Sequence, residues 1–205
     1  EISGAQPEPD ADPELYGEPE PYAEAADVLT PQGVLAAMTA LKAKYPDGTP
    51  WTDHTPYDDG NYYHWKGGPL GGKNIVAVGC VAFAFLLSDE AFGTLPARMY
   101  DPGQFSFSDI KSGDILRLNG GAHTVIVLEV IDGEGVVIAE GNNSGKVLWG
   151  RTLSKDEITQ NASNYITRYP EGYVPPDDPS AGEEIGSGKA GALSWTLTKA
   201  GVLTL

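Results

Sequence analysis

Two acidic, proline-rich segments near the ends of the chain confine the hydrophobic core to the residues between them. Residues 1–27 hold nine acidic residues and no basic residue, and residues 171–188 hold five acidic residues and no basic residue. Segments of this composition bury too little apolar surface to offset the entropy lost on folding. We therefore expect a disordered spacer over 1–27, one folded domain over 28–170 and a linker over 171–188.

The composition excludes several classes of partner. The chain has 205 residues, 40% of them hydrophobic, and a formal net charge of −16 that resides mostly in the two acidic segments. Without a clustered basic surface, nucleic acid is not an expected partner. We expect no transmembrane segment, because no apolar run reaches the ~18 residues of a membrane span. The first residues lack the basic and apolar regions of a secretory signal, so for an exported protein we expect the signal to have been removed.

The hydrophobic pattern of the central domain changes once, from helical to extended. Thr30 as cap and Pro31 in the first turn predict a helix whose apolar face carries Val34, Leu35, Met38 and Leu41. A second helix is expected from Cys80 to about Phe92, where Gly93 ends it. Strand patterns follow over residues 112–118, 123–131, 135–142, 146–154 and 164–170, with a short capped helix at "SKDEI". A helix that carries the cysteine and packs on an antiparallel sheet is an α+β fold.

The last residues carry a separate strand pattern. The sequence "KAGALSWTLTKAGVLTL", residues 189–205, predicts two strands around a turn. A third strand would be needed for independent stability. We therefore expect the start of a truncated β domain here.

Cys80 is the only cysteine of the chain, so an internal disulfide and a multi-cysteine zinc site are excluded. A lone cysteine is often a buried structural residue. Cys80 also follows a glycine at the expected amino end of a helix, where unpaired N–H groups and the helix dipole favour a thiolate. The same N–H groups are suited to bind an oxyanion. Both interpretations, structural and nucleophilic, remain open at this point.

A thiolate nucleophile needs a base, and the chain offers three histidines. His54 and His64 lie in an aromatic-rich loop that also holds Asp53, Asp58 and Asp59. Their spacing matches no metal-ligand motif, so solvation in a loop is the favoured interpretation and no metal or other cofactor is expected. His123 opens a strand of branched apolar residues, where it is either an edge residue or a base.

Two polar residues near the end of the next strand favour the second role for His123. A hairpin turn at 132–135 places residue i opposite residue 267 − i, which puts His123 on the same face as Glu140 and Asn142. We expect this face to point towards the helix that bears Cys80, because polar groups on a buried face need partners. This register places Asn142 nearer the histidine, and either residue is suited to orient the imidazole.

The segments "GCVAFAF", "SGDILRL", "HTVIVLEV" and "AEGN" together resemble the CHAP family, the cysteine- and histidine-dependent amidohydrolases and peptidases. This family belongs to the papain-like group that includes NlpC-type cell-wall enzymes. The resemblance covers roughly residues 30–170 and implies a papain-like α+β fold with an antiparallel sheet. It also implies that Cys80 is the nucleophile, that His123 is the general base, and that Glu140 and Asn142 support the ring or the oxyanion. Val81 departs from the small or polar residue that many relatives have.

The resemblance implies hydrolysis of amide bonds in peptidoglycan, at the sugar–peptide bond or within the stem or cross-bridge peptide. The terminal "LSWTLTKAGVLTL" resembles short β repeats of Gram-positive surface proteins. We therefore expect a secreted, cell-surface-associated monomeric module within a longer multidomain protein. Trp51, Tyr63, Trp65 and Trp149 are candidates to line a substrate groove, with core packing as the alternative. The other functions considered are a non-catalytic binding module on the same fold and a redox or transferase role of the same residues.

Overall fold

The structure of the protein is a computed structural model that describes residues 29–176, 184–191, 193–198 and 203–204. The described helices are α1 (Pro31–Ala40), α2 (Gly79–Phe92) and α3 (Lys155–Asn161), with 3-10 turns at Leu41–Ala43 and Phe107–Asp109. The strands of the main sheet are β1 (Arg98–Tyr100), β2 (Ile115–Leu118), β3 (His123–Ile131), β4 (Gly135–Asn143), β5 (Lys146–Ser154) and β6 (Ala162–Thr167). The fold is α+β with antiparallel sheets, as predicted. The spacer predicted over 1–27 lies outside the described residues.

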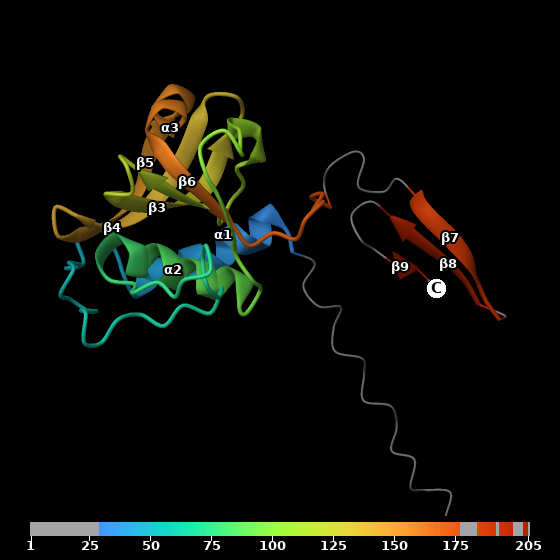
Figure 1. Cartoon of the computed structure of the whole chain (residues 1–205), viewed down its shortest axis with the longest axis horizontal. Helices are drawn as coiled ribbons and strands as arrows, with labels where there is room; N and C mark the ends of the chain where they lie inside the picture. Colours follow the sequence, from blue (N-terminus) through green and yellow to red (C-terminus); the bar gives the residue numbers. More distant parts are fainter. Residues whose placement is uncertain (1–28, 177–183, 192, 199–202, 205) are drawn as a thin grey trace, which may run out of the picture.

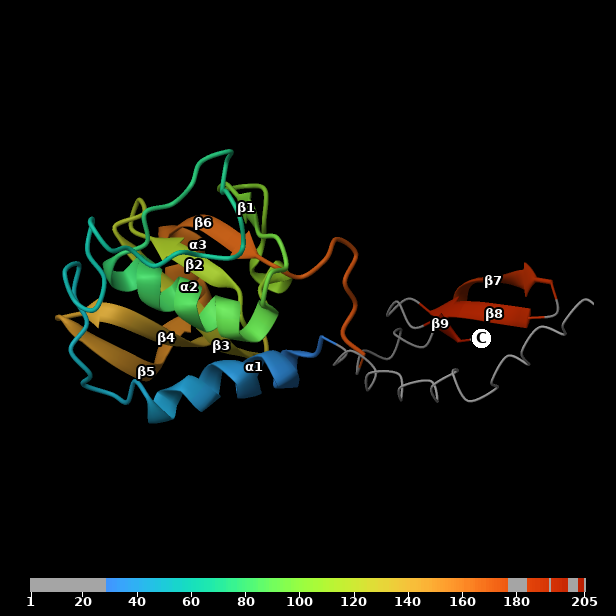
Figure 2. The ribbon, with the colours of Figure 1, turned by 90° about the horizontal axis from the view of Figure 1, so that it is seen from below.

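The six strands pair in the order β1-β6-β2-β3-β4-β5, and each neighbouring pair is antiparallel. Helices α1 and α2 cover one face of this sheet and α3 lies on the other (Figure 1). The view turned by 90° shows α1 running alongside α2 in the same layer (Figure 2). Among the described residues, no helix is long and apolar enough to cross a membrane.

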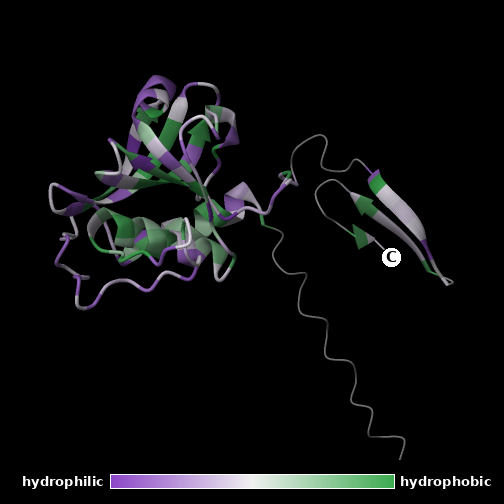
Figure 3. Ribbon diagram, in the orientation of Figure 1, coloured by the Kyte–Doolittle hydropathy of each residue, from purple (hydrophilic) through white to green (hydrophobic). Residues whose placement is uncertain are grey.

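Alternation along the strands produces a separate core on each face of the sheet, because successive side chains point to opposite sides. On the α2 side, Ile126 and Ala139 pack with Phe83 and Phe85 of the helix. On the α3 side, the core contains Val125, Val127, Ile138, Leu153 and Ile158. Apolar colouring accordingly concentrates on α2 and the central strands in Figure 3. The strands are therefore buried on both faces, which explains their nearly continuous apolar sequences.

The cap at Thr30 and the helix end at Gly93 predicted from sequence are confirmed. Thr30 caps α1, with its hydroxyl accepting a hydrogen bond of 2.9 Å from the amide of Gly33. Helix α2 ends at Phe92, and Gly93 follows with a φ of 58°, a conformation that favours glycine. The short helix at 155–161 begins with a reciprocal pair between Ser154 and Glu157. Strand β1 was not predicted, because three residues are too few to show a period.

The hairpin of β3 and β4 has a different register from the predicted one. Near the turn Ile131 pairs with Gly135, one residue from its predicted partner, and beyond an irregularity between Val127 and Glu129 the partner of Val127 is Ile138. The prediction placed Glu140 opposite Val127, so the observed register differs by two residues at this point. A shift of two residues does not change which residues of the two strands share a face on this side of the irregularity. The expectation that His123 and Glu140 share a face therefore holds.

The carboxyl-terminal residues form a separate three-stranded sheet of β7 (Glu184–Ala190), β8 (Leu193–Thr198) and β9 (Leu203–Thr204). The two strands predicted over 189–205 correspond to β8 and β9, but the linker predicted to residue 188 is too long, because β7 begins inside it at Glu184. Glycine there makes room for a partner: a Cβ on Gly188 would lie 2.8 Å from the indole of Trp195. The glycines that indicated a linker are thus strand positions packed under an aromatic ring.

Candidate active site

Cys80 is the second residue of helix α2, and the start of this helix is fixed from outside it. The buried Trp51 donates a hydrogen bond of 2.8 Å from its indole nitrogen to the carbonyl of Gly79. Val78, which precedes the helix, makes no side-chain cap hydrogen bond. The first N–H groups of the helix therefore have no side-chain acceptor from the cap residue. Cys80 itself is partly exposed.

Gly79 permits two polar side chains to approach the amino end of α2. Its φ is 51°, and a Cβ built at this position would lie 1.9 Å from Oδ1 of Asp53 and 3.0 Å from Nδ2 of Asn142. The Asn142 amide donates a 3.0 Å hydrogen bond to that same Asp53 oxygen. Asn142 thus stands beside the helix that carries Cys80, and Asp53 joins it there. The sequence offered no signal for Asp53 beyond its position in an acidic loop.

His123 is oriented by Glu140. The ring Nε2 lies 2.7 Å from Oε2 of Glu140, whose side chain is fully buried. Arg151 binds the same carboxylate through two nitrogens, at 2.6 and 2.8 Å, and Asn143 donates to it at 3.0 Å. Burial alone would raise the pKa of Glu140, but the hydrogen bonds from Arg151, His123 and Asn143 outweigh it and lower the pKa to about 2. A permanently ionised carboxylate therefore faces the imidazole.

Cys80 and His123 form a coupled pair. The hydrogen bond to Cys80, followed by that to Glu140, raises the pKa of His123 to about 9. Burial raises the pKa of the Cys80 thiol, yet hydrogen bonds from His123 and Thr124 and the charge on the ring outweigh burial and lower it. Because Nε2 is held by Glu140, the ring nitrogen that faces the thiol is Nδ1. The two shifts act together to favour a thiolate beside an imidazolium over the neutral pair.

The face of the sheet that carries His123 and Glu140 corrects one expectation. Arg151, the partner of Glu140, stands opposite Ile138, which belongs to the core on the α3 side. His123 and Glu140 therefore lie on the face away from α2, and not on the face towards α2 as predicted. The thiol and the ring still meet because Cys80 begins its helix and His123 begins its strand. They come together around the end of the sheet.

The four aromatic residues predicted to line a substrate groove have other roles. Trp51 and Trp149 are buried, at 1% and 9% exposure, because they pack against Phe83 of α2. Trp65 stacks on Phe85 with ring centroids 3.8 Å apart. Tyr63 donates a 2.9 Å hydrogen bond to the buried Asp89. The groove assignment is wrong for the two buried tryptophans, and core packing accounts for all four residues.

The two remaining histidines lie outside this arrangement. His54 and His64 are exposed in the loop between α1 and α2, and the ring of His64 lies 4.6 Å from that of Tyr62. Within the described ranges, no cluster of three or more His, Cys, Asp or Glu side chains is placed to hold a metal ion.

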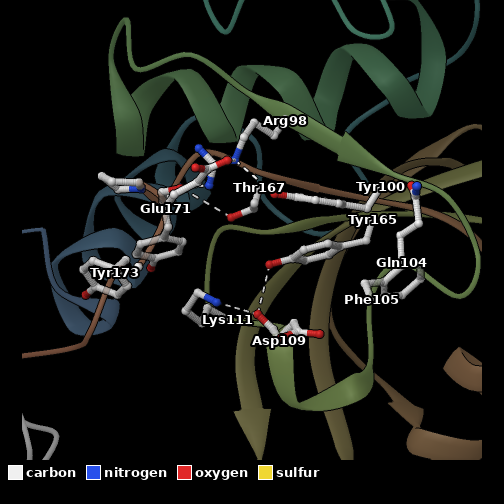
Figure 4. Close-up of a pocket in the computed structure, with 13 residues that line it drawn as sticks. Arg98, Tyr100, Gln104, Phe105, Asp109, Lys111, Tyr165, Thr167, Glu171 and Tyr173 are labelled. Atoms are coloured by element: carbon white, nitrogen blue, oxygen red, sulfur yellow. Dashed lines mark hydrogen bonds and ion pairs between the residues drawn. The ribbon is translucent and has the colours of Figure 1, made fainter.

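Two cavities flank the Cys80–His123 pair. One, of about 240 Å³, includes Val81 and Thr124, the residues that follow Cys80 and His123. The other, of about 130 Å³, lies on the α3 side and includes His123 and Arg151. A larger cavity of about 360 Å³ is formed at the β1–β6 edge by Tyr100, Tyr165 and their neighbours, and Figure 4 shows its polar groups already bonded to one another. That third cavity contains none of the predicted site residues.

Comparison of the sequence with protein-family models and with curated proteins found no match. Among solved structures, one titled "The crystal structure of Ly7917" is similar to the chain with a TM-score of 0.35 and 19% sequence identity. The match covers 68% of this chain and 62% of that chain, so the chain spans less than two thirds of the length of its structural neighbour. Similarity at this level does not assign the chain to a fold family.

Proposed function

We propose that the protein is a cysteine-dependent amide hydrolase of the CHAP type, with a papain-like arrangement of helix and sheet, that acts on peptidoglycan. The observation that carries this proposal is the pairing of Cys80 with His123 while Glu140 holds the far side of the ring at 2.7 Å. A structural cysteine has no need of an imidazole that is itself oriented by a buried carboxylate. The choice of peptidoglycan rests on the sequence resemblance, as does a secreted, surface-associated location.

The arrangement supports acyl transfer in two steps. The Cys80 thiolate attacks the amide carbonyl, and N–H groups at the uncapped start of α2 receive the negative charge on oxygen. The His123 imidazolium gives its proton to the departing amine, which leaves a thioester. Water then attacks the thioester as His123 removes a proton from it, and the carboxylic acid leaves with the thiolate restored. Glu140 stays ionised throughout and stabilises the charged ring.

Digestion of purified peptidoglycan, followed by mass spectrometry of the released fragments, tests this function. We expect the wild-type protein to release fragments with one new amino group and one new carboxyl group per cleaved bond. Replacement of Cys80 by alanine should abolish release, while circular dichroism and the unfolding midpoint stay unchanged. Release that survives the substitution would reject the assignment. Wall binding by both proteins without release by either would instead indicate a binding module.

A further inference from the structure

The cavity beside Cys80 is lined in part by Val81 and Thr124, the residues that follow Cys80 and His123 in the sequence. Val81 and Phe85 of α2 line it, and so does Thr124 of β3, whose amide and hydroxyl contribute to lowering the pKa of the thiol. The opposite wall comes from the loop before α2, through Leu70 and Ile75. A group bonded to the sulfur of Cys80 is therefore next to this space, which measures about 240 Å³.

The lining of this cavity combines apolar side chains with positive charge only. Leu70, Phe85 and Ile166 are almost fully buried there. The charged members are Lys73 and Arg117, and none of the lining residues in the described part of the chain is acidic. An apolar space with charge of one sign favours a ligand that is apolar along its length and oppositely charged at one point.

Arg117 also has hydrogen-bonding capacity that the described structure does not use. Its Nη2 donates to the carbonyl of Gly121 at 3.0 Å, which fixes the guanidinium against the turn before β3. Its Nε is buried and has no hydrogen-bond partner. A buried donor without an acceptor is costly, so an incoming acceptor gains more here than at an exposed arginine.

We propose that this cavity binds the acyl side of the substrate, through an aliphatic side chain that ends in a carboxylate. The acyl group stays on Cys80 while the amine leaves with the proton from His123, and the cavity is lined by Val81 and Phe85, which follow Cys80 on α2. The aliphatic stem lies against Leu70, Ile75 and Phe85, and the carboxylate is held by Arg117 and Lys73. This assignment rests on the proposed nucleophilic role of Cys80 and adds the chemical class of the residue that it attacks.

Four acetyl-aminoacyl chloromethyl ketones, which alkylate a cysteine nucleophile, test the assignment on the full chain. Their side chains are those of alanine, norleucine, lysine and 2-aminosuberic acid, so they compare a short chain with long chains that end in methyl, ammonium or carboxylate. We expect the carboxylate compound to inactivate Cys80 about tenfold faster than the alanine compound, and the ammonium compound to be slower than the methyl compound. Equal rates for all four, or preference for the ammonium compound, would overturn the cavity assignment.

Matched variants separate the two parts of the cavity. Ile75→Trp should fill the apolar part and reduce the carboxylate-to-alanine ratio to below about threefold, whereas Val76→Trp, at a neighbouring side chain that is 53% exposed, should leave it unchanged. Lys73→Gln should lower the carboxylate-to-ammonium ratio about two- to fivefold, and Lys66→Gln should not. Lys73 is exposed, so this second variant tests the assignment even where Ile75→Trp fails to fold.

The reagent iodoacetamide distinguishes failure of the cavity assignment from failure of the proposed function. It is small and carries no side chain, so its rate reports only the reactivity of the Cys80 thiol. A fast rate with iodoacetamide and equal rates with the four ketones would overturn the cavity assignment alone. A thiol that resists iodoacetamide below neutral pH would overturn the nucleophile, and the cavity assignment with it.

Discussion

The carboxylate of Glu140 lies 2.7 Å from Nε2 of His123, so the glutamate and not Asn142 orients the imidazole. Asn142 instead donates to Asp53 beside the amino end of α2. The two polar residues at the end of β4 thus serve opposite sides of the candidate site. Glu140 holds the ring of His123, and Asn142 stands beside the amino end of α2, where the proposed mechanism places the negative charge of a substrate oxygen.

Replacing Glu140 with glutamine should impair the pair without removing either reacting group. The imidazolium loses its ionised partner, so the pKa of His123 should fall below about 9 and the pKa of Cys80 should rise. We expect hydrolysis to fall about 10²-fold or more, because loss of the group that orients a catalytic histidine costs up to about 10⁴. The kcat/KM of Glu140→Gln measures this effect. Glu129→Gln, at an exposed position of β3, is the matched control and should keep full activity.

The pH dependence of hydrolysis should be bell-shaped, because the active form carries a thiolate and an imidazolium together. On the acid side the rate rises as Cys80 loses its proton, below the ordinary range of a thiol. On the alkaline side it falls as His123 loses its proton, near pH 9. Measurement of kcat/KM from about pH 4 to pH 11 locates both limbs. An alkaline limb near the ordinary histidine value of about 6.5 would show that no ion pair forms.

Substitution of Gly79 with alanine should remove activity more than stability. The new methyl group would meet Oδ1 of Asp53 at 1.9 Å, and a φ of 51° is strained for alanine. Asp53 and Asn142 must therefore move away from Cys80. The control is Gly93→Ala at the other end of α2, where φ is 58° and a Cβ meets nothing within 4 Å.

Both alanine variants should lose about 1 kcal/mol from the backbone conformation, because glycine is the residue that adopts positive φ without steric cost. Only the variant at Gly79 should also lose hydrolytic activity. Paired measurements of the unfolding free energy and of kcat/KM separate the two effects. Equal activities in the two variants would show that the contacts around Gly79 do not matter for hydrolysis.

Asp114 should make the fold less stable as the pH rises. It is fully buried, and burial raises its pKa to about 7 even though Lys111, Thr167 and Tyr165 act in the opposite direction. Between the unfolded value near 3.8 and about 7, the folded state binds more protons than the unfolded state. The unfolding free energy therefore falls as the pH rises through this window.

Asp114→Asn removes this titration and provides its test. Relative to wild type, we expect the variant to gain unfolding free energy from about pH 4 to pH 7, on the order of several kcal/mol. Denaturant unfolding at several pH values measures the gain. Asp132→Asn, in the exposed hairpin turn, is the control for the substitution itself. A constant difference between Asp114→Asn and wild type would indicate an ordinary pKa for Asp114.

The helices and most strands could be predicted because their signals are local. A cap at Thr30, a glycine at 93 and runs of branched residues act within a few positions, so the sequence contains the whole interaction. Strand β7 was missed because its glycines are explained by the ring of Trp195, which lies on another strand. Local composition cannot reveal a partner that is brought in by pairing.

For the candidate site, the residue types were determined by the sequence itself: one thiol before a helix, one histidine at a strand start, and a glutamate and an asparagine on the next strand. Only the tertiary structure decided which partner each one takes. The turn and the irregularity in β3 each shift the register by one residue from the predicted one, and Arg151 supplies the charge that holds Glu140. The tertiary structure also decided that Trp51 and Trp149 are core residues. The sequence could not decide this, because aromatic rings are equally suited to a core and to a groove until the neighbouring elements pack around them.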